Sequence, residues 1–190
     1  INPTVRQQID EQVQAQRKAG IIEQSASPYS STVLLIPKSD GSARFCINYK
    51  PLNAITKRES YQMPRVDDSL SALKGSNYFT SMDLSSAFWQ IPMDEASKDL
   101  TSFSTNGGTW RYNRMPFGLA NGPAIFSRFI DTVLAGLKWS VCLVYMDDIL
   151  IHTPTLGEHI TALRSICERI DQYGLRFKAK KCFVCVEKVK

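Results

Sequence analysis

Apolar residues recur with helical spacing in four stretches of the chain. Val5, Ile9 and Val13 repeat every fourth residue, and Gly20 follows that stretch as a stop signal. The longest stripe follows Pro123 and contains seven apolar residues on one face. This periodicity predicts helices over 3–19, 65–73, 121–137 and 158–173.

Shorter runs that are rich in β-branched and aromatic residues predict strands. Two pairs of consecutive runs flank hairpin turns, at Ser39-Asp40-Gly41 and at Asn106-Gly107-Gly108. Because helices are intermixed with strands that short turns join, the pattern predicts an α+β fold with an antiparallel sheet rather than a doubly wound one. The expected strands are 33–36, 44–49, 78–84, 101–105, 109–112, 141–146 and 149–153.

Composition excludes several classes of protein. With 43% hydrophobic and 22% charged residues in 190, the chain is neither disordered, collagen-like nor a coiled coil. Its longest apolar run, 141–146, is far shorter than the ~20 residues of a membrane helix, and residues 1–20 lack a signal peptide's apolar core. A net charge of +5 suggests an anionic partner, of which nucleic acid is the commonest large example. The chain starts at Ile1 and is expected to be a piece of a longer protein.

The cysteines point to an intracellular protein with reduced thiols, because their number, five, is odd. Cys182 and Cys185 form one CxxC pair, but no second pair or histidine pair stands at zinc spacing. A structural zinc site is therefore not expected.

Acidic residues mark the strongest candidate site. Asp147-Asp148 connects two apolar strands, although tight turns usually prefer Asn-Gly or Asp-Gly. On these residues alone, a solvated acidic turn and a site for a hard cation such as Mg²⁺ are about equally favoured. Asp83 at the end of strand 78–84 supports the cation site, since three carboxylates on one sheet could serve two metal ions in a phosphoryl transfer.

A loop with two glycines and two prolines, 115–123, leads directly into the helix at 121–137. Its backbone N–H groups suit an anion or a flat ring, although a capped helix start is the simpler interpretation. Basic residues gather over 38–58 and 176–190 and could contact phosphates, although each group could also be an ordinary solvated face.

Taken together, these segments resemble the reverse transcriptase domain (RNA-directed DNA polymerase) of gypsy-type LTR retrotransposon Pol polyproteins. Four palm motifs occur in the family's order, after segments that resemble the entry to the fingers and the fingers hairpin. The matching segments are 19–23, 27–31, 37–53, 79–84, 115–119, 145–148 and 174–182. The departures, at Ala43, Asn48, Lys50 and Phe88-Trp89, avoid the three carboxylates.

The resemblance implies a role for each matching residue. Three catalytic residues would be carboxylates that also bind metal, namely Asp83, Asp147 and Asp148. The fourth would be Lys181, a basic residue proposed in the family to protonate pyrophosphate. One backbone carbonyl would join the metal ligands, that of Leu84. The triphosphate would be held by Lys38 and Arg44, the sugar selected by Phe88 as a steric gate, and the nucleotide pocket lined by Phe117 and Gly118.

The resemblance also implies the wider organisation. Residues 1–77 would form the N-terminal helix and fingers, which could recur within 85–120, and residues 78–190 mainly the palm, without a thumb. The palm would be an antiparallel sheet backed by helices. Cofactors would be two Mg²⁺ ions, with Mn²⁺ possible. Partners would be an RNA or DNA template with primer, dNTPs, and the protease, ribonuclease H and integrase of the parent polyprotein. The protein would act in the cytoplasm, within virus-like particles, and would not bind a membrane.

Two other functions compete with DNA synthesis. A catalytically inactive remnant of the same fold would bind nucleic acid without extending a primer, although the intact Asp83, Asp147 and Asp148 argue against decay. A two-metal nuclease would use similar carboxylates but would need neither an aromatic gate at Phe88 nor the basic pair of the fingers.

Overall fold

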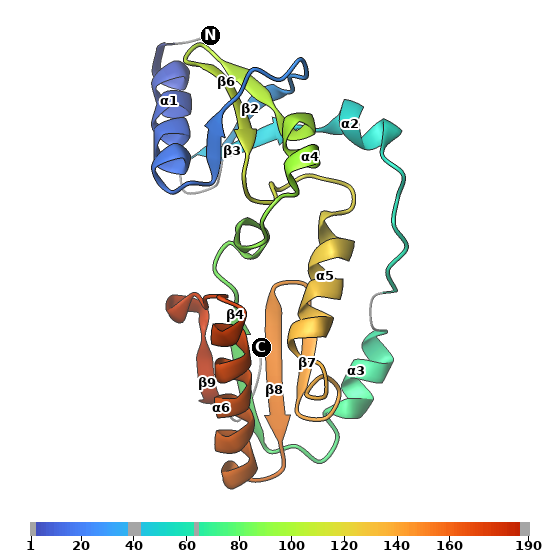
Figure 1. Cartoon of the computed structure of the whole chain (residues 1–190). Coiled ribbons are helices and arrows are strands. Elements are labelled where there is room, and N and C mark those ends of the chain that lie inside the picture. Colours follow the sequence, from blue (N-terminus) through green and yellow to red (C-terminus); the bar gives the residue numbers. More distant parts are fainter. Residues whose placement is uncertain (1–2, 38–42, 63–64, 187–190) are drawn as a thin grey trace. The chain divides into compact units, whose positions relative to one another are not determined.

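The structure is a computed structural model that describes residues 3–37, 43–62 and 65–186 (Figure 1). The chain divides into two compact units, one of residues 1–58 with 88–122 and the other of residues 59–87 with 123–190. These units divide the chain at 58, 87 and 122, whereas the sequence placed a boundary at 77 and allowed the first region to recur within 85–120.

The first unit packs helix α1 with two small antiparallel sheets. The predicted N-terminal helix is confirmed, and its partly buried Ile9 and buried Val13 contact a core that includes Phe103 and Trp110. One sheet has the strand order β1-β6-β5, and the other is the hairpin β2-β3. The elements are α1 (Pro3–Lys18), β1 (Ile22–Gln24), β2 (Thr32–Pro37), β3 (Ala43–Asn48), α2 (Lys50–Ile55), η1 (Ala87–Gln90, which starts at the unit boundary), α4 (Glu95–Lys98), η2 (Asp99–Thr101), β5 (Phe103–Thr105) and β6 (Gly108–Tyr112).

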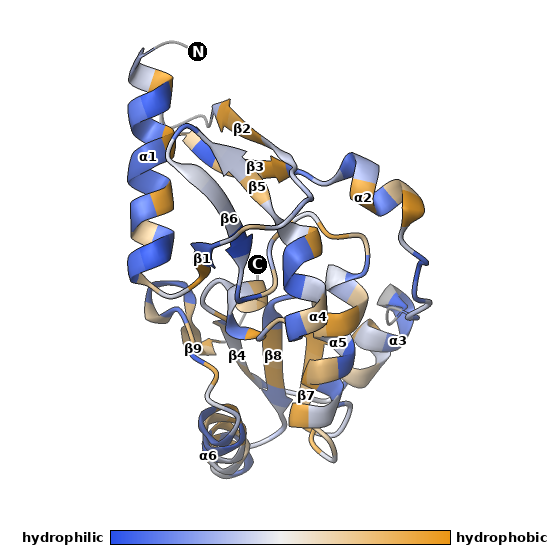
Figure 2. Ribbon diagram, turned by 45° about the horizontal axis from the view of Figure 1, so that its top comes forward, coloured by the Kyte–Doolittle hydropathy of each residue, from blue (hydrophilic) through white to orange (hydrophobic). Residues whose placement is uncertain are grey.

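The second unit is a four-stranded antiparallel sheet with the strand order β7-β8-β4-β9. Figure 2 shows apolar residues concentrated in β8 and β7, as expected for strands that are buried beneath helices. The predicted α+β class with an antiparallel sheet backed by helices is confirmed. The elements are α3 (Val66–Ala72), β4 (Tyr78–Asp83), α5 (Gly122–Val133), β7 (Cys142–Tyr145), β8 (Asp148–Thr153), α6 (Leu156–Gln172), η3 (Ala179–Lys181) and β9 (Phe183–Val186).

Helices α5 and α6 supply the apolar side chains that cover this sheet. Phe126 and Ile130 of α5 and Ile166 of α6 are almost fully buried, as is Ile151 of β8. Helix α5 ends at Val133, four residues before the predicted end, although Leu134 N–H still donates to the Ile130 carbonyl. None of the helices in the described ranges has the length and apolar character needed to cross a bilayer.

A buried histidine links helix α6 to the sheet. His159 is 1% exposed; its Nε2 lies 2.7 Å from Thr80 Oγ1 of β4, and its Nδ1 lies 3.0 Å from Thr153 Oγ1 of β8. Thr80 Oγ1 also accepts the Cys185 N–H of β9 at 3.0 Å. The ring therefore connects α6 to β4 and β8, and Thr80 in turn bonds to β9. Burial lowers the pKa of His159.

The free energy of unfolding should fall as the pH drops below the ordinary histidine value of 6.5, partly because of His159. The unfolded chain takes up a proton there while the buried ring stays neutral, so acid favours unfolding. His159→Gln should reduce this pH dependence and should cost about 2 kcal/mol at pH 7.5 through unpaired threonine hydroxyls. Urea denaturation at pH 7.5 and 5.5 measures both effects, and an unchanged pH dependence would contradict the assignment. His152→Gln is the comparison, since His152 is also buried and its pKa is also lowered.

Candidate active site

Three carboxylates meet where strands β4 and β8 pair. Asp83 is the last residue of β4, and its Cα partner across the ladder is Asp148, the first residue of β8. The Leu84 N–H donates to the Asp147 carbonyl at 3.2 Å and extends this pairing by one bond. Because the strands are antiparallel, the end of one meets the start of the other. The predicted proximity of Asp83 to the 147–148 pair is confirmed.

The turn that carries these carboxylates differs by one residue from the prediction. Tyr145 pairs with Asp148, so the two connecting residues are Met146 and Asp147 rather than Asp147 and Asp148. The correction follows from strand register, which counts Asp148 as the first residue of β8. Met146 has a φ of 52°, in the left-handed region that residues other than glycine seldom adopt. Such strain is typical of functional turns, which the surrounding structure holds in place.

The carboxylates crowd one another electrostatically. Burial raises the pKa of Asp147, and the neighbouring charges of Asp83 and Asp148 raise it further, whereas Lys181 lowers it. Crowded carboxylates favour any added cation, because it offsets their mutual repulsion.

Lys181 supplies one positive charge to this cluster. Its Nζ lies 2.7 Å from Asp83 Oδ2, and this hydrogen bond is the main reason that the pKa of Lys181 is raised. Backbone hydrogen bonds hold the segment that carries Lys181 beside the end of β4. The Ser85 N–H donates to the Arg176 carbonyl at 2.9 Å, and the Lys178 N–H donates to the Asp83 carbonyl at 2.8 Å. The basic residue of the fourth motif that contacts Asp83 is thus Lys181; the resemblance favours Lys181 over Lys180 as a proton donor to pyrophosphate, and that role stays a prediction.

The donor chemistry of this cluster fits a hard divalent cation, since aspartate carboxylates are the ligands that Mg²⁺ takes from proteins. Among the residues that the structure describes, no three His, Cys, Asp or Glu side chains are arranged to hold a metal ion. One oxygen of Asp83 is bonded to the Lys181 ammonium instead. Leu84, the proposed carbonyl ligand, is buried directly after Asp83.

The remaining candidate residues belong to the first unit, and three of its aromatic rings form a cluster. The ring of Phe88 lies 5.1 Å from that of Phe117, centroid to centroid, and Trp89 packs edge-on against Phe117 at 5.8 Å. Phe117 is 48% exposed, so the cluster presents an aromatic surface to solvent. Sequence reasoning gave Trp89 no role, although its position next to the expected gate was a usable signal.

The loop that carries Phe117 is held by Asn53, a residue to which the sequence assigned no role. Asn53 Nδ2 donates to the Gly118 carbonyl at 2.8 Å, and its Oδ1 accepts the Ala120 N–H at 2.9 Å. Gly118 has a φ of 95°, and an added Cβ would lie 3.6 Å from the ring of Tyr49. No local pattern reveals a contact over 65 residues.

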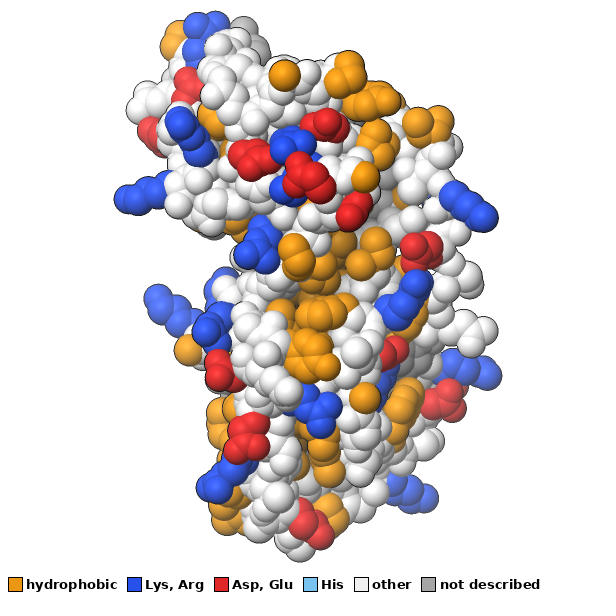
Figure 3. Space-filling model, in the orientation of Figure 1, with side chains coloured by type: hydrophobic (Ala, Val, Ile, Leu, Met, Phe, Trp, Pro, Cys, Tyr) orange, Lys and Arg blue, Asp and Glu red, His pale blue; other side chains and the backbone are white. Residues whose placement is uncertain are grey.

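One predicted triphosphate contact, Arg44, lies on the β2-β3 hairpin. Arg44 is exposed on β3, opposite Ile36 of β2. Lys38 lies outside the described residues. Figure 3 shows basic and acidic side chains intermixed on the face drawn, rather than one broad basic surface.

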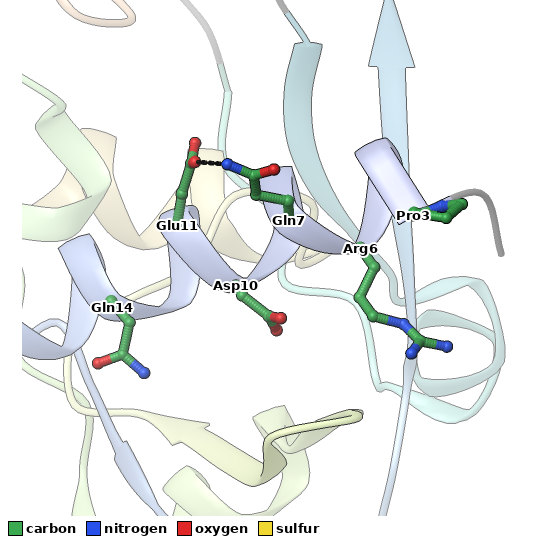
Figure 4. A pocket seen from close by; sticks show the side chains of 6 residues that line it. All are labelled: Pro3, Arg6, Gln7, Asp10, Glu11 and Gln14. Atoms are coloured by element: carbon green, nitrogen blue, oxygen red, sulfur yellow. Dashed lines mark hydrogen bonds between the residues drawn. The ribbon is translucent and has the colours of Figure 1, made fainter.

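A shallow surface hollow of about 560 Å³ lies elsewhere, along helix α1, and none of the candidate residues lines it. Its walls carry one basic side chain, Arg6, and two acidic ones, Asp10 and Glu11, and Gln7 donates to Glu11 at 2.9 Å (Figure 4). This mixture of opposite charges favours no particular ligand.

Comparison with known proteins gives a consistent set of similarities. The profile of the family described as reverse transcriptase (RNA-dependent DNA polymerase) matches residues 36–190. The chain is 38% identical over 180 residues to a retrovirus-related Pol polyprotein from transposon 297 of Drosophila melanogaster, covering 92% of the chain and 17% of the relative. It is 32% identical to the transposon Tf2-3 polyprotein of Schizosaccharomyces pombe, covering 95% of the chain and 14% of the relative.

Solved structures show the same similarity. A foamy viral protease-reverse transcriptase in complex with RNA/DNA hybrid matches with a TM-score of 0.87 and 26% identity, over 97% of this chain and 25% of that one. A foamy viral protease-reverse transcriptase dRH in complex with double-stranded DNA matches with a TM-score of 0.85 and 26% identity, over 97% of this chain and 32% of that one. The chain thus spans less than a fifth of these two polyproteins and about a third or less of these two solved chains.

Proposed function

The chain belongs to the reverse transcriptase (RNA-dependent DNA polymerase) family, and we propose that it forms the fingers and palm of an RNA-directed DNA polymerase encoded by a gypsy-type LTR retrotransposon. The observation that carries this proposal is the pairing of Asp83 with Asp148 across two strands, with Asp147 in the adjoining turn. The fingers, expected at 1–77 and within 85–120, would fall largely in the first unit, and the palm in the second.

The proposed reaction is template-directed addition of a nucleotide to a primer. The primer 3′-oxygen attacks the α-phosphorus of a dNTP in line, a new P–O bond forms, and the bond to pyrophosphate breaks. Asp83, Asp147 and Asp148, with the Leu84 carbonyl, would hold two Mg²⁺ ions, or Mn²⁺ in their place. When bound, these ions supply positive charge for the attacking oxygen and the leaving pyrophosphate.

The other side chains would position the nucleotide. Arg44 and Lys38 would bind the triphosphate, since guanidinium and ammonium groups form charge-assisted hydrogen bonds with phosphate oxygens. The partly exposed aromatic cluster of Phe88 and Phe117, beside Gly118, offers an apolar surface for the sugar and base. Lys181 would give a proton to pyrophosphate as it leaves.

The proposed partners follow from the relatives. The two foamy viral proteins are described with double-stranded DNA and with RNA/DNA hybrid, which supports an RNA or DNA template with a DNA primer and dNTPs here. The matched Pol polyproteins support a parent chain with protease, ribonuclease H and integrase. Such a protein would act inside the cell, within virus-like particles.

A primer-extension assay tests this function. Residues 1–190, and the longer natural polypeptide that contains them, are incubated with a labelled primer on RNA and DNA templates, with Mg²⁺ or EDTA. The proposal expects extension that requires dNTPs and Mg²⁺. Shortening of the primer without dNTPs would favour the nuclease, and binding without extension in the longer polypeptide would favour the inactive remnant.

A further inference from the structure

The ion pair between Lys181 and Asp83 uses a carboxylate that the proposed function assigns to metal. The Lys181 ammonium is bonded to Asp83 Oδ2. The same ammonium acts electrostatically on Asp147 and Asp148, so its charge is shared among all three carboxylates. A cation of the protein itself therefore occupies part of the site that a divalent ion would use.

The two partners differ in how easily they move. The Asp83 side chain is 15% exposed, and its backbone is fixed because its carbonyl accepts the Lys178 N–H, so the carboxylate has little room to move. The Lys181 side chain is 57% exposed and begins from the short helix η3, which Arg176 and Lys178 tie to the end of β4. The lysine is therefore the partner that can leave: it can turn into solvent without disturbing the strand, and exposed ion pairs are weak.

We propose that Lys181 is an internal counter-ion that bonds to Asp83 in the metal-free protein and releases it when a divalent metal ion binds. The inference rests on the proposed function only in taking the three carboxylates as a metal site. A divalent ion bound at Asp83 would neutralise the carboxylate and repel the Lys181 ammonium, so metal binding and the ion pair oppose each other. Metal binding would then free the Lys181 ammonium to donate a proton elsewhere, for example to pyrophosphate.

Metal affinity gives the first test, with Mn²⁺ alone as the probe. Free Mn²⁺ is measured by electron paramagnetic resonance during titration of residues 1–190, at one pH and ionic strength. If Mn²⁺ binds only to molecules in which the lysine has left Asp83, the apparent affinity for Mn²⁺ is reduced in proportion to the fraction of such molecules. Lys181→Met should therefore bind Mn²⁺ at least about threefold more tightly than the wild type.

Lys180→Met is the matched control, because Lys180 lies on the same turn and its loss changes the net charge equally. Within the described residues, no ion pair joins Lys180 to Asp83. Lys181→Arg keeps the charge and should bind Mn²⁺ less tightly than Lys181→Met. Equal affinity in Lys181→Met and Lys180→Met would overturn the inference.

The reactivity of the lysine gives a second test, which does not depend on a substitution. Residues 1–190 are labelled briefly with acetic anhydride, with and without saturating Mg²⁺, and labelling is read by mass spectrometry. Mg²⁺ should increase the labelling of Lys181 relative to Lys180, because a released amine no longer donates to Asp83 and is more accessible to the reagent. An unchanged ratio at saturating Mg²⁺ would overturn the inference.

Asp147→Asn separates a failure of this inference from a failure of the proposed function. Suppose that Asp147→Asn binds Mn²⁺ more weakly while Lys181→Met and Lys180→Met bind it equally. This result would reject the exchange of lysine for metal but would support the metal site. Mn²⁺ binding unaffected by Asp147→Asn would remove the metal site itself, and the lysine exchange with it.

Discussion

Asp147→Asn should lower the rate of primer extension by about 10²- to 10³-fold, since removing a single group that stabilises developing charge has effects of that size. The substitution keeps the size of the side chain but removes one of three crowded negative charges beside the β7-β8 turn. Metal would bind more weakly, and the charge that develops on the transferred phosphoryl group would lose part of its stabilisation.

Affinity for the template-primer should change little in the same variant. That affinity comes from lysine and arginine contacts with phosphates and is governed by salt, so both measurements are made at one stated salt concentration. Asp68→Asn is the matched control: Asp68 is exposed on α3 of the same unit, and its loss changes the net charge equally. Full extension activity in Asp147→Asn would reject the polymerase mechanism and favour a module that only binds nucleic acid.

Phe88→Val should admit ribonucleotides at least about tenfold better relative to deoxyribonucleotides. The proposed gate excludes the 2′-hydroxyl by the volume of the Phe88 ring, which packs 5.1 Å from Phe117. A smaller side chain makes room for that hydroxyl, so the effect should appear in the ratio of kcat/KM values for rNTP and dNTP. Incorporation of dNTP should stay largely intact.

Trp89→Val provides the comparison for this experiment. Trp89 contacts the same Phe117 ring, so its loss also loosens the aromatic cluster, but it leaves the Phe88 ring in place. Sugar selection should therefore change in Phe88→Val and not in Trp89→Val. Equal changes in the two variants would mean that the cluster acts through packing, and no change in either would remove Phe88 from the gate role.

Much of the second unit could be predicted from local sequence. Helix α6 and strands β4, β7 and β8 each carry a pattern of apolar residues that reports their own burial, and their predicted positions agree with the structure to within a few residues. Strand β9 was not predicted, because three of its four side chains are exposed and give no alternation. Strand β1 has only three residues and exists through its pairing with Trp110–Tyr112.

The sequence alone picked out the three proposed catalytic carboxylates, because acidic residues at a strand end and in a tight turn stand inside motifs that occur in the order of a reverse transcriptase. Only the tertiary structure decided how they meet. The register of β4 on β8 pairs Asp83 with Asp148, and that of β7 on β8 moves the turn to Met146 and Asp147. The Lys181–Asp83 bond joins residues 98 positions apart. The physical reason is that side-chain periodicity encodes the burial of each element separately, whereas register and ion pairing depend on the packing of elements that are distant in the chain.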